Sequence, residues 1–141
     1  MIVAIDPGKT GGIAYEFDGE LYAIPMPSTV VKIPTPAPVT TVVIEKVHAF
    51  PGQGVVSMFS FGVQYGKVLA WAEMQTDNIH LIDPRTWLKM YPGEGKQRTI
   101  DYCQEHFPEV SLYPGKKRTP HDGMADALCL LNYAKKHLTY E

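Results

Sequence analysis

The sequence predicts a mixed α/β fold, a five-stranded sheet flanked by helices. Five short stretches rich in apolar and β-branched residues have strand character, and the segments around the last of them have helical character. The first three stretches follow one another closely, which is typical of antiparallel strands. A long helical segment separates the last two, as a crossover between parallel strands requires. The predicted order is β-β-β-β-α-β-α-α, in one domain that spans residues 1–141.

The N-terminal part contains the predicted antiparallel strands. Residues 2–6, 12–17 and 21–24 are apolar or alternate between apolar and polar positions. Asp18-Gly19, between the second and third stretches, is a favoured two-residue hairpin turn. Residues 25–38 contain five prolines, which exclude a long helix and predict an extended connection.

A buried central strand and a long helix follow this connection. Residues 40–47 form a short β-branched run that ends in a charge. Residues 56 to about 76 fit a helix capped by Ser57, in which Gly62 and Gly66 would let another backbone approach closely. The remaining predicted elements are a strand at 78–83, a short helix start at 84–88, a helix at 96–106 and a C-terminal helix that begins near Pro120.

Composition excludes several classes of protein. Cys103 and Cys129 are the two cysteines and have no CxxC spacing, so neither a disulfide framework nor a thiolate zinc site is expected. The N-terminus lacks the features of a signal peptide, and no run approaches the ~20 apolar residues that a membrane span requires. We therefore expect a soluble, cytoplasmic protein that does not enter a membrane.

Acidic residues in three distant parts of the chain indicate a metal site. Asp6 ends the first strand, Glu45 ends the central strand, and Asp122 and Asp126 lie near the start of the C-terminal helix. At ~100° per residue the last two are ~40° apart around the helix. Hard cations such as Mg²⁺ or Mn²⁺ suit carboxylates. Two such ions ~3.5–4 Å apart activate water and stabilise a leaving oxygen, which predicts phosphodiester hydrolysis.

Each acid also has a plainer interpretation. Asp6 before Pro-Gly is typical of a turn residue, Glu45 of a surface residue at a strand end, and Asp122 of a helix N-cap. Asp126 is harder to explain in this way, because its helix is otherwise largely apolar and a buried unpaired charge is costly. The combination of the four favours a metal site.

Several groups of residues together resemble RuvC. They are Ile5-Asp6-Pro-Gly8 with Thr10-Gly, Val43-Ile-Glu45-Lys-Val, Gly62 with Gly66, and Asp126-Ala-Leu. More closely, Pro51-Gly-Gln-Gly-Val-Val-Ser57-Met-Phe-Ser-Phe-Gly62, Asp83-Pro-Arg-Thr-Trp87 and His121-Asp-Gly-Met-Ala-Asp126-Ala resemble the phage branch of the RuvC-like Holliday junction resolvases. The resemblance covers nearly the whole chain in the expected order. It implies an RNase H-like fold, a homodimer, and Mg²⁺-dependent paired nicking of four-way or related branched DNA in a bacterial cell or phage-infected host.

The resemblance also implies the metal ligands. By position, Asp6, Glu45 and Asp126 would hold the ions, two per site, with Mn²⁺ as a substitute for Mg²⁺. Bacterial RuvC commonly has a fourth ligand three residues before the last aspartate, where this chain has Gly123. Asp122 or His121 must then substitute. We favour Asp122 because it shares a helix face with Asp126, and His121 remains the alternative as ligand or proton donor.

DNA contacts are implied by two further regions. In RuvC an aromatic residue just after the glutamate strand enters the junction, and here that position holds His48, with Phe50 two residues on. An exposed aromatic ring is able to stack on an unpaired base, although packing beneath the loop explains Phe50 equally well. Basic residues in the region where the family contacts the DNA backbone are Lys96, Arg98, Lys116, Lys117 and Arg118. Solvated loops and helix faces are their plainer interpretation.

Three alternative functions remain open. The first is a non-catalytic branched-DNA-binding protein of RNase H-like fold. The second is a nucleotide-binding domain, because Asp6-Pro-Gly-Lys-Thr10-Gly resembles the phosphate loop of sugar kinases and actin-like ATPases, although those proteins need two such domains. The third is a nuclease of RNase H type, or one with broader selectivity for branched DNA, since an acid site of this kind does not itself select the branch.

Overall fold

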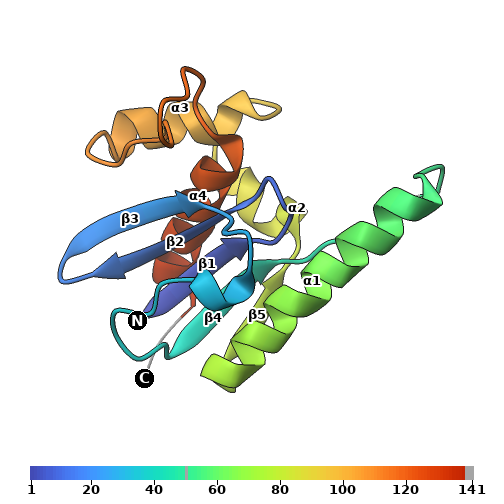
Figure 1. Ribbon diagram of the computed structural model, residues 1–141. Coiled ribbons are helices and arrows are strands. Elements are labelled where there is room, and N and C mark those ends of the chain that lie inside the picture. The colour runs from blue at the N-terminus through green and yellow to red at the C-terminus, as the bar shows by residue number, and fades with distance from the viewer. Residues whose placement is uncertain (50, 139–141) are drawn as a thin grey trace.

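The computed structural model describes residues 1–49 and 51–138. Its centre is a five-stranded mixed sheet with strand order β3-β2-β1-β4-β5 (Figure 1). The strands are β1 (Ile2–Asp6), β2 (Gly12–Phe17), β3 (Glu20–Pro25), β4 (Thr41–Glu45) and β5 (Ile79–Ile82). β1 and β3 both pair antiparallel with β2, whereas β4 runs parallel to both β1 and β5. The mixed five-stranded sheet predicted from the sequence is therefore confirmed.

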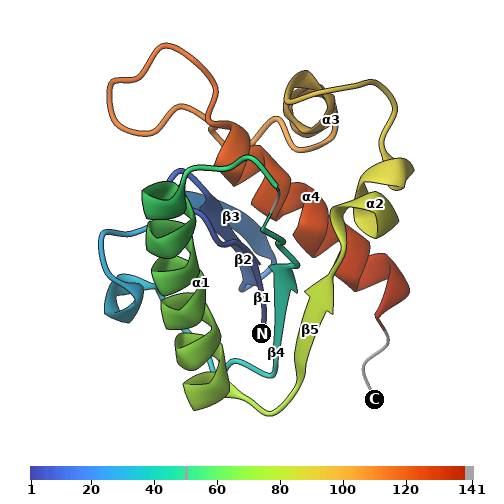
Figure 2. The ribbon, with the colours of Figure 1, turned by 90° about the vertical axis from the view of Figure 1, so that its right-hand side faces the viewer.

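Helices cover both faces of this sheet. They are α1 (Val55–Gln75), α2 (Pro84–Trp87), α3 (Gln97–His106) and α4 (Asp122–His137), with 3-10 turns η1 (Val30–Lys32) and η2 (Leu88–Met90). Figure 2 shows α1 on one side of the sheet and α4 on the other. The α/β class and the order of the predicted elements are both as expected.

The β2–β3 hairpin has the predicted two-residue turn. Phe17 pairs with Glu20, so Asp18 and Gly19 alone make the connection. Both residues have positive φ angles, 55° for Asp18 and 80° for Gly19. The twist of such a left-handed pair matches that of the flanking strands, and Asp-Gly is among the sequences that adopt it most readily.

One prediction about the long helix is wrong, and another is not met within a single chain. Gly54 is the N-cap of α1 and makes no side-chain hydrogen bond, so Ser57 lies inside the first turn and does not cap the helix. Gly62 and Gly66 receive no other segment of the described chain, since a Cβ atom on either would have no neighbour within 4 Å. Within residues 1–49 and 51–138, both glycines therefore lie on an open surface of α1.

The sheet divides the core into two layers. Successive side chains of a strand point to opposite faces, so alternate residues of the central strands belong to different layers. Ala4 and Val43 pack in the layer under α4, whereas their neighbours on the strands pack in the layer under α1. Asp6 lies two residues beyond Ala4, and Glu45 lies two beyond Val43. Both acids therefore continue the face that α4 covers.

The proline-rich connection agrees with expectation, whereas β4 is shorter than predicted. The proline-rich segment 25–38 is extended as predicted, apart from the single turn of η1. β4 ends at Glu45, two residues earlier than predicted, and the chain then leaves the sheet towards α1. Among the helices of the described residues, none has the length and apolar character needed to cross a bilayer.

Candidate metal centre

Asp6 and Glu45 lie at the carboxyl ends of two neighbouring parallel strands. Ile5 of β1 pairs with Ile44 of β4, so the residues that follow them end their strands at the same edge of the sheet. The turn after β1 also influences Asp6, because the backbone N–H of Gly8 lowers the pKa of its carboxyl group and so favours the charged form. The fold thus brings together two acids that are far apart in the sequence.

The start of α4 supplies the other two carboxylates. His121 is the N-cap of this helix, and its Nδ1 atom accepts a hydrogen bond of 3.0 Å from the backbone N–H of Met124. Asp122 is therefore the first helical residue, and its plainer interpretation as the N-cap is wrong. Asp126 follows one turn later, where a helix places residues on the same side as Asp122.

The four carboxylates form one electrostatic cluster. The pKa of Asp6 is raised from 3.8 to about 8, first by burial and then by repulsion from Glu45, Asp126 and Asp122. Burial, followed by repulsion from Asp126, raises the pKa of Glu45 to about 7. Burial also raises the pKa of Asp126 to about 6, and the charge of Asp122 adds to this shift. These acids are therefore close enough to repel one another in a partly desolvated site.

Thr99 supports this cluster, although no sequence pattern pointed to it. Its hydroxyl group donates a hydrogen bond of 2.6 Å to Oδ1 of Asp126. Thr99 lies in α3 and is buried, at 1% exposure. The hydrogen bond lowers the pKa of Asp126 and so opposes the effect of burial. A threonine in an amphipathic helix carries no pattern that identifies such a partner, and the contact arises from the packing of α3 on α4.

Two glycines explain why position 123 has no carboxylate. A Cβ atom on Gly12 would lie 2.5 Å from the carbonyl oxygen of Gly123. A Cβ atom on Gly123 would in turn collide with the backbone of Thr10 and Gly11. The turn between β1 and β2 therefore fills the space that a side chain at 123 would need. Any fourth carboxylate must come from a neighbouring position, and Asp122 is the acid that α4 provides there.

The predicted phosphate-binding residues differ in their surroundings. Lys96 lies closest to the acids, with Nζ 3.6 Å from Oδ2 of Asp122, and its side chain is 84% exposed. Arg98 instead holds the preceding loop, because Nε and Nη2 donate to the carbonyl oxygen of Gly93 at 2.8 and 2.6 Å. A third donor of Arg98 reaches the carbonyl oxygen of Leu88 at 3.5 Å. Lys96 is thus available beside the site, whereas much of the hydrogen-bonding capacity of Arg98 is used within the chain.

Lys116, Lys117 and Arg118 are exposed on the loop between α3 and α4. Figure 2 shows this loop projecting beside the start of α4, at the same end of the helix as Asp122. The structure therefore brings the basic triplet to the end of the molecule that carries the acids. Lys135 lies at the other end of α4 and pairs with Glu16.

His48 lies beside the centre rather than in it. Its Nε2 atom is 3.8 Å from Oδ2 of Asp83, and its side chain is half exposed. Asp83 is the N-cap of α2 and is bound by Arg85 through both carboxylate oxygens. These hydrogen bonds from Arg85 lower the pKa of Asp83 to about 2. Phe50, the second predicted aromatic contact, lies outside the described residues.

Two hollows share Phe61, and Glu45 of the acid cluster lines one of them. One of about 280 Å³ is lined by Glu45, Lys46, Val47, His48, Gln53, Phe61 and Pro84. The other, of about 400 Å³, lies between the β1–β2 turn and α1 and is lined by Lys9, Val56, Ser57, Ser60, Phe61 and Gln64. Phe61 belongs to both, and its Cε1 atom would lie 3.7 Å from a Cβ atom on Gly8. Lys9 was not among the predicted DNA contacts, yet it lines this second hollow and follows Asp6 by three residues in the sequence.

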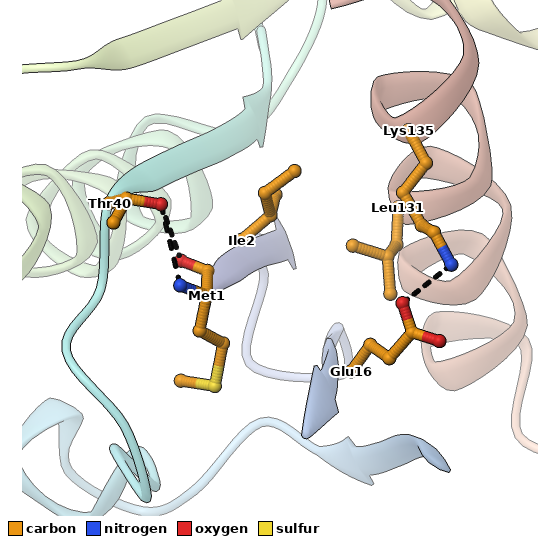
Figure 3. Close-up of a pocket in the computed structure, with 6 residues that line it drawn as sticks. All are labelled: Met1, Ile2, Glu16, Thr40, Leu131 and Lys135. Carbon is orange, nitrogen blue, oxygen red and sulfur yellow. Dashed lines mark hydrogen bonds and ion pairs between the residues drawn. The ribbon is translucent and has the colours of Figure 1, made fainter. Parts of the chain in front are cut away.

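A further hollow of about 330 Å³ lies at the opposite end of β1 and α4 (Figure 3). It is lined by Met1, Ile2, Glu16, Thr40, Leu131 and Lys135. Lys135 Nζ is 2.6 Å from Oε1 of Glu16, so the charges at its rim neutralise each other. None of the four clustered acids lines this hollow, and we do not assign it to the same chemistry.

The acid cluster has the chemistry of a site for hard divalent cations. Its donors are carboxylate oxygens, which Mg²⁺ and Mn²⁺ prefer. The raised pKa values of Asp6, Glu45 and Asp126 come first from burial and then from repulsion between the acids, and a cation would relieve this repulsion. Among the described residues, no three His, Cys, Asp or Glu side chains already converge as a formed metal cage. The four acids are instead a looser group, consistent with their mutual repulsion. The residues therefore fit divalent ions by donor type and charge.

No protein-family model matches the chain, and no curated protein matches it. Its function must therefore be argued from the acids and their surroundings.

Proposed function

We propose that the protein is a metal-dependent endonuclease that resolves Holliday junctions and related branched DNA by paired, symmetric nicking. The observation that carries this proposal is the cluster of Asp6, Glu45, Asp122 and Asp126 at the ends of β1 and β4 and the start of α4. Two hard cations are held by several carboxylates that converge on one site and would repel one another without the ions.

The sheet supports an RNase H-like and RuvC-like assignment. Its first three strands are antiparallel and its last two are added in parallel beside β1, with α1 as the crossover. In this proposal the acids follow the resemblance position by position: Asp6, Glu45 and Asp126 are ligands. Asp122 is the fourth in preference to His121, because Nδ1 of His121 already accepts the N–H of Met124.

Mg²⁺ or Mn²⁺, when bound, activates water for attack on the phosphodiester and stabilises the leaving oxygen. The residues of the chain position and support that chemistry. Thr99 fixes one oxygen of Asp126, and the backbone N–H of Gly8 favours the charged form of Asp6. The ammonium group of Lys96, beside Asp122, is placed to neutralise charge on a phosphate or on the acids themselves.

Two exposed basic regions support a DNA partner. Lys116, Lys117 and Arg118 project on the loop before α4. The hollow lined by Lys9, between the β1–β2 turn and α1, is also lined by Ser57 and Ser60. Lysines and hydroxyl groups are common partners of phosphate oxygens. We expect a DNA strand that passes through the acid cluster to contact the basic loop, the residues of this hollow, or both.

The outer face of α1 supports a homodimer. Large apolar side chains lie exposed on this helix: Val55 at 83%, Val56 at 83%, Phe59 at 75%, Val63 at 44% and Met74 at 82%. Figure 1 shows its N-terminal half extending beyond the sheet. Gly62 and Gly66 leave the same helix open to a close neighbour. Exposed apolar patches of this kind mark protein interfaces, and a second copy would supply the second active site that paired nicking needs.

The decisive experiment compares four substrates side by side: a labelled four-way junction, a fork, a duplex and an RNA–DNA hybrid. Each is incubated with purified protein and Mg²⁺ or Mn²⁺, and the products are mapped on both strands. The proposal expects symmetric nicks in opposing strands of the junction and little cleavage of the duplex. Preferential cleavage of the hybrid would favour an RNase H-type enzyme. Junction binding without cleavage in either metal would favour the non-catalytic alternative.

A further inference from the structure

Trp87 carries a buried hydrogen-bond donor that the protein leaves unpaired. The side chain is 1% exposed, at the end of α2. Among the buried side-chain nitrogen and oxygen atoms of the described residues, Nε1 of Trp87 lacks a hydrogen-bond partner. An indole N–H only donates, and most buried polar groups find a partner. Such an atom in a folded core therefore calls for a physical explanation.

The fold places Trp87 next to Glu45. Glu45 is paired with Ile82 of β5, and Asp83 then caps the short helix α2 that carries Trp87. The indole ring packs in the layer under α4 together with Val43. Glu45 is two residues beyond Val43 on the same strand and shares its face of the sheet. The ring and the carboxylate are therefore on one side of the sheet, at neighbouring strand ends.

The donor and the carboxylate already influence each other. The indole N–H lowers the pKa of Glu45, against the upward shift from burial and from nearby acids. Even so, Nε1 of Trp87 has no acceptor that completes a hydrogen bond. The indole is held edge-on to Tyr91, with ring centroids 6.3 Å apart and an angle of 73° between the rings. The side chain of Glu45 is flexible and less buried than that of Trp87, so the carboxylate is the partner that is able to move.

We propose that Trp87 is a positioning residue, whose indole N–H donates to the Glu45 carboxylate and holds it in place as a metal ligand. Groups that bind a ligand from behind commonly set its orientation and its affinity for the ion. The metal-binding part of this inference rests on the proposed function. The contact between Trp87 and Glu45 does not, and it is testable without any nuclease activity.

The first experiment uses the indole N–H signals in ¹⁵N–¹H spectra of the metal-free protein. The chain has two tryptophans, so there are two signals, and Trp71→Phe assigns them. Trp71 lies in the layer under α1, across the sheet, and is the internal control. Glu45→Ala should shift the Trp87 signal upfield through loss of its acceptor, and Mg²⁺ added to the wild-type protein should also move it. A Trp87 signal that moves no more than that of Trp71 in both tests overturns the inference.

The second experiment measures Mg²⁺ affinity by calorimetry in Trp87→Phe and Trp71→Phe. Both variants exchange a buried indole for a phenyl ring, but only the first removes the donor beside Glu45. Trp87→Phe should weaken Mg²⁺ binding about tenfold or more, whereas Trp71→Phe should leave it unchanged. Equal affinities in the two folded variants contradict the inference. If Trp87→Phe does not fold, the response of the indole signal to Glu45→Ala decides the question.

The two proposals fail in different ways. An indole signal that responds to Glu45→Ala in a protein that cuts no DNA would uphold the contact and reject the nuclease. A protein that cuts junctions but whose Trp87 signal ignores both Glu45→Ala and Mg²⁺ would do the opposite.

Discussion

The hydroxyl group of Thr99 in α3 donates a 2.6 Å hydrogen bond to Asp126 in α4, and this bond joins the outermost helix of the α4 layer to the acid cluster. Thr99 is buried, so no water molecule is expected to replace its hydroxyl group as the donor to Asp126 when the bond is lost.

Thr99→Val should therefore impair the centre without unfolding the protein. The substitution keeps the shape of the side chain and removes the donor, which raises the pKa of Asp126 further. Loss of a hydrogen bond to a charged group should cost about 1.5–3 kcal/mol of stability. Mg²⁺ affinity and junction cleavage should fall roughly 10- to 100-fold. Thr99→Ser, which retains the hydroxyl group, is the control. Equal metal affinity in the Val and Ser variants would remove Thr99 from the site.

Neutral replacements of the acids should separate cleavage from binding. Asp6→Asn, Glu45→Gln and Asp126→Asn each remove one charge from the cluster, so each should abolish nicking in Mg²⁺ while junction binding survives. Glu16→Gln, at the distant hollow, provides the matched control and should cut normally. Gel assays of binding and cleavage on the same labelled junction measure both properties. Full cleavage by any of the three variants would contradict its role as a ligand.

The stability of the metal-free protein should depend on Asp6 and on pH. The pKa of Asp6 is raised from 3.8 to about 8. Between these values the folded protein keeps a proton that the unfolded chain releases. Its contribution to stability therefore falls as the pH rises through this range. Asn does not ionise, so the Asp6→Asn variant does not lose this stability as the pH rises. Its Tm should exceed that of the wild-type protein by a margin that grows from pH 4 to pH 8.

Thermal unfolding in a chelator measures this margin at each pH. Added Mg²⁺ should then raise the Tm of the wild-type protein more than that of Asp6→Asn, because a ligand stabilises the state that binds it. A margin that stays constant with pH would show that Asp6 ionises in the folded protein as it does in the unfolded chain.

The basic loop should contribute to affinity through salt-dependent contacts. Replacing Lys116, Lys117 and Arg118 by Ala should weaken junction binding and reduce the slope of log K against log salt by roughly 0.9 for each lost phosphate contact. Lys32→Ala together with Lys136→Ala, exposed lysines outside this loop, is the control. An unchanged slope in the loop variant would reduce these residues to solvated charges.

Arg98 should behave differently from the basic loop. Because its guanidinium group binds the carbonyl oxygen of Gly93 twice, Arg98→Ala should lower the Tm even without DNA. Its effect on DNA affinity should follow from the disturbed loop more than from a lost phosphate contact. A normal Tm with a reduced salt slope would instead support the direct contact predicted from the sequence.

The exposed face of α1 should control the oligomeric state. Phe59→Glu places a charge in the middle of the apolar surface and should convert a dimer into a monomer, as sedimentation equilibrium measures. Nicks in the junction should then become unpaired. Val31→Glu is a fair control, because Val31 is 83% exposed but belongs to η1 and not to the exposed apolar face of α1. A wild-type protein that stays monomeric at high concentration would contradict the homodimer.

Local sequence was sufficient to predict the strands and the acids. The β-branched runs, the Asp-Gly turn and the proline-rich connection indicate the order of the elements. Because successive side chains of a strand alternate between its two faces, the strand positions of Asp6 and Glu45 also determine which face of the sheet they share. Thr99 and Trp87 were missed in their present roles, because each meets its partner only through packing of helices on the sheet. Neither a buried threonine nor a buried tryptophan has a sequence pattern that reveals what it touches.

The glycines illustrate the same limit. Gly62 and Gly66 have the one-turn spacing of a helix that meets another backbone, yet no such neighbour exists within the described chain. The close approach occurs instead between Gly12 in β2 and Gly123 in α4. Because the two glycines belong to distant elements, no local sequence spacing reveals their contact. The side chain of His121, likewise, caps α4 through a hydrogen bond that its sequence position alone did not specify.

The contact between Gly12 and Gly123 has an evolutionary implication. A Cβ atom at either position would meet backbone of the other segment, so a second substitution does not relieve the first. Descendants of this chain should therefore keep both glycines as long as the turn after β1 keeps its place against α4. A lineage that regains an acid at 123 should also carry a remodelled or displaced turn after its first strand.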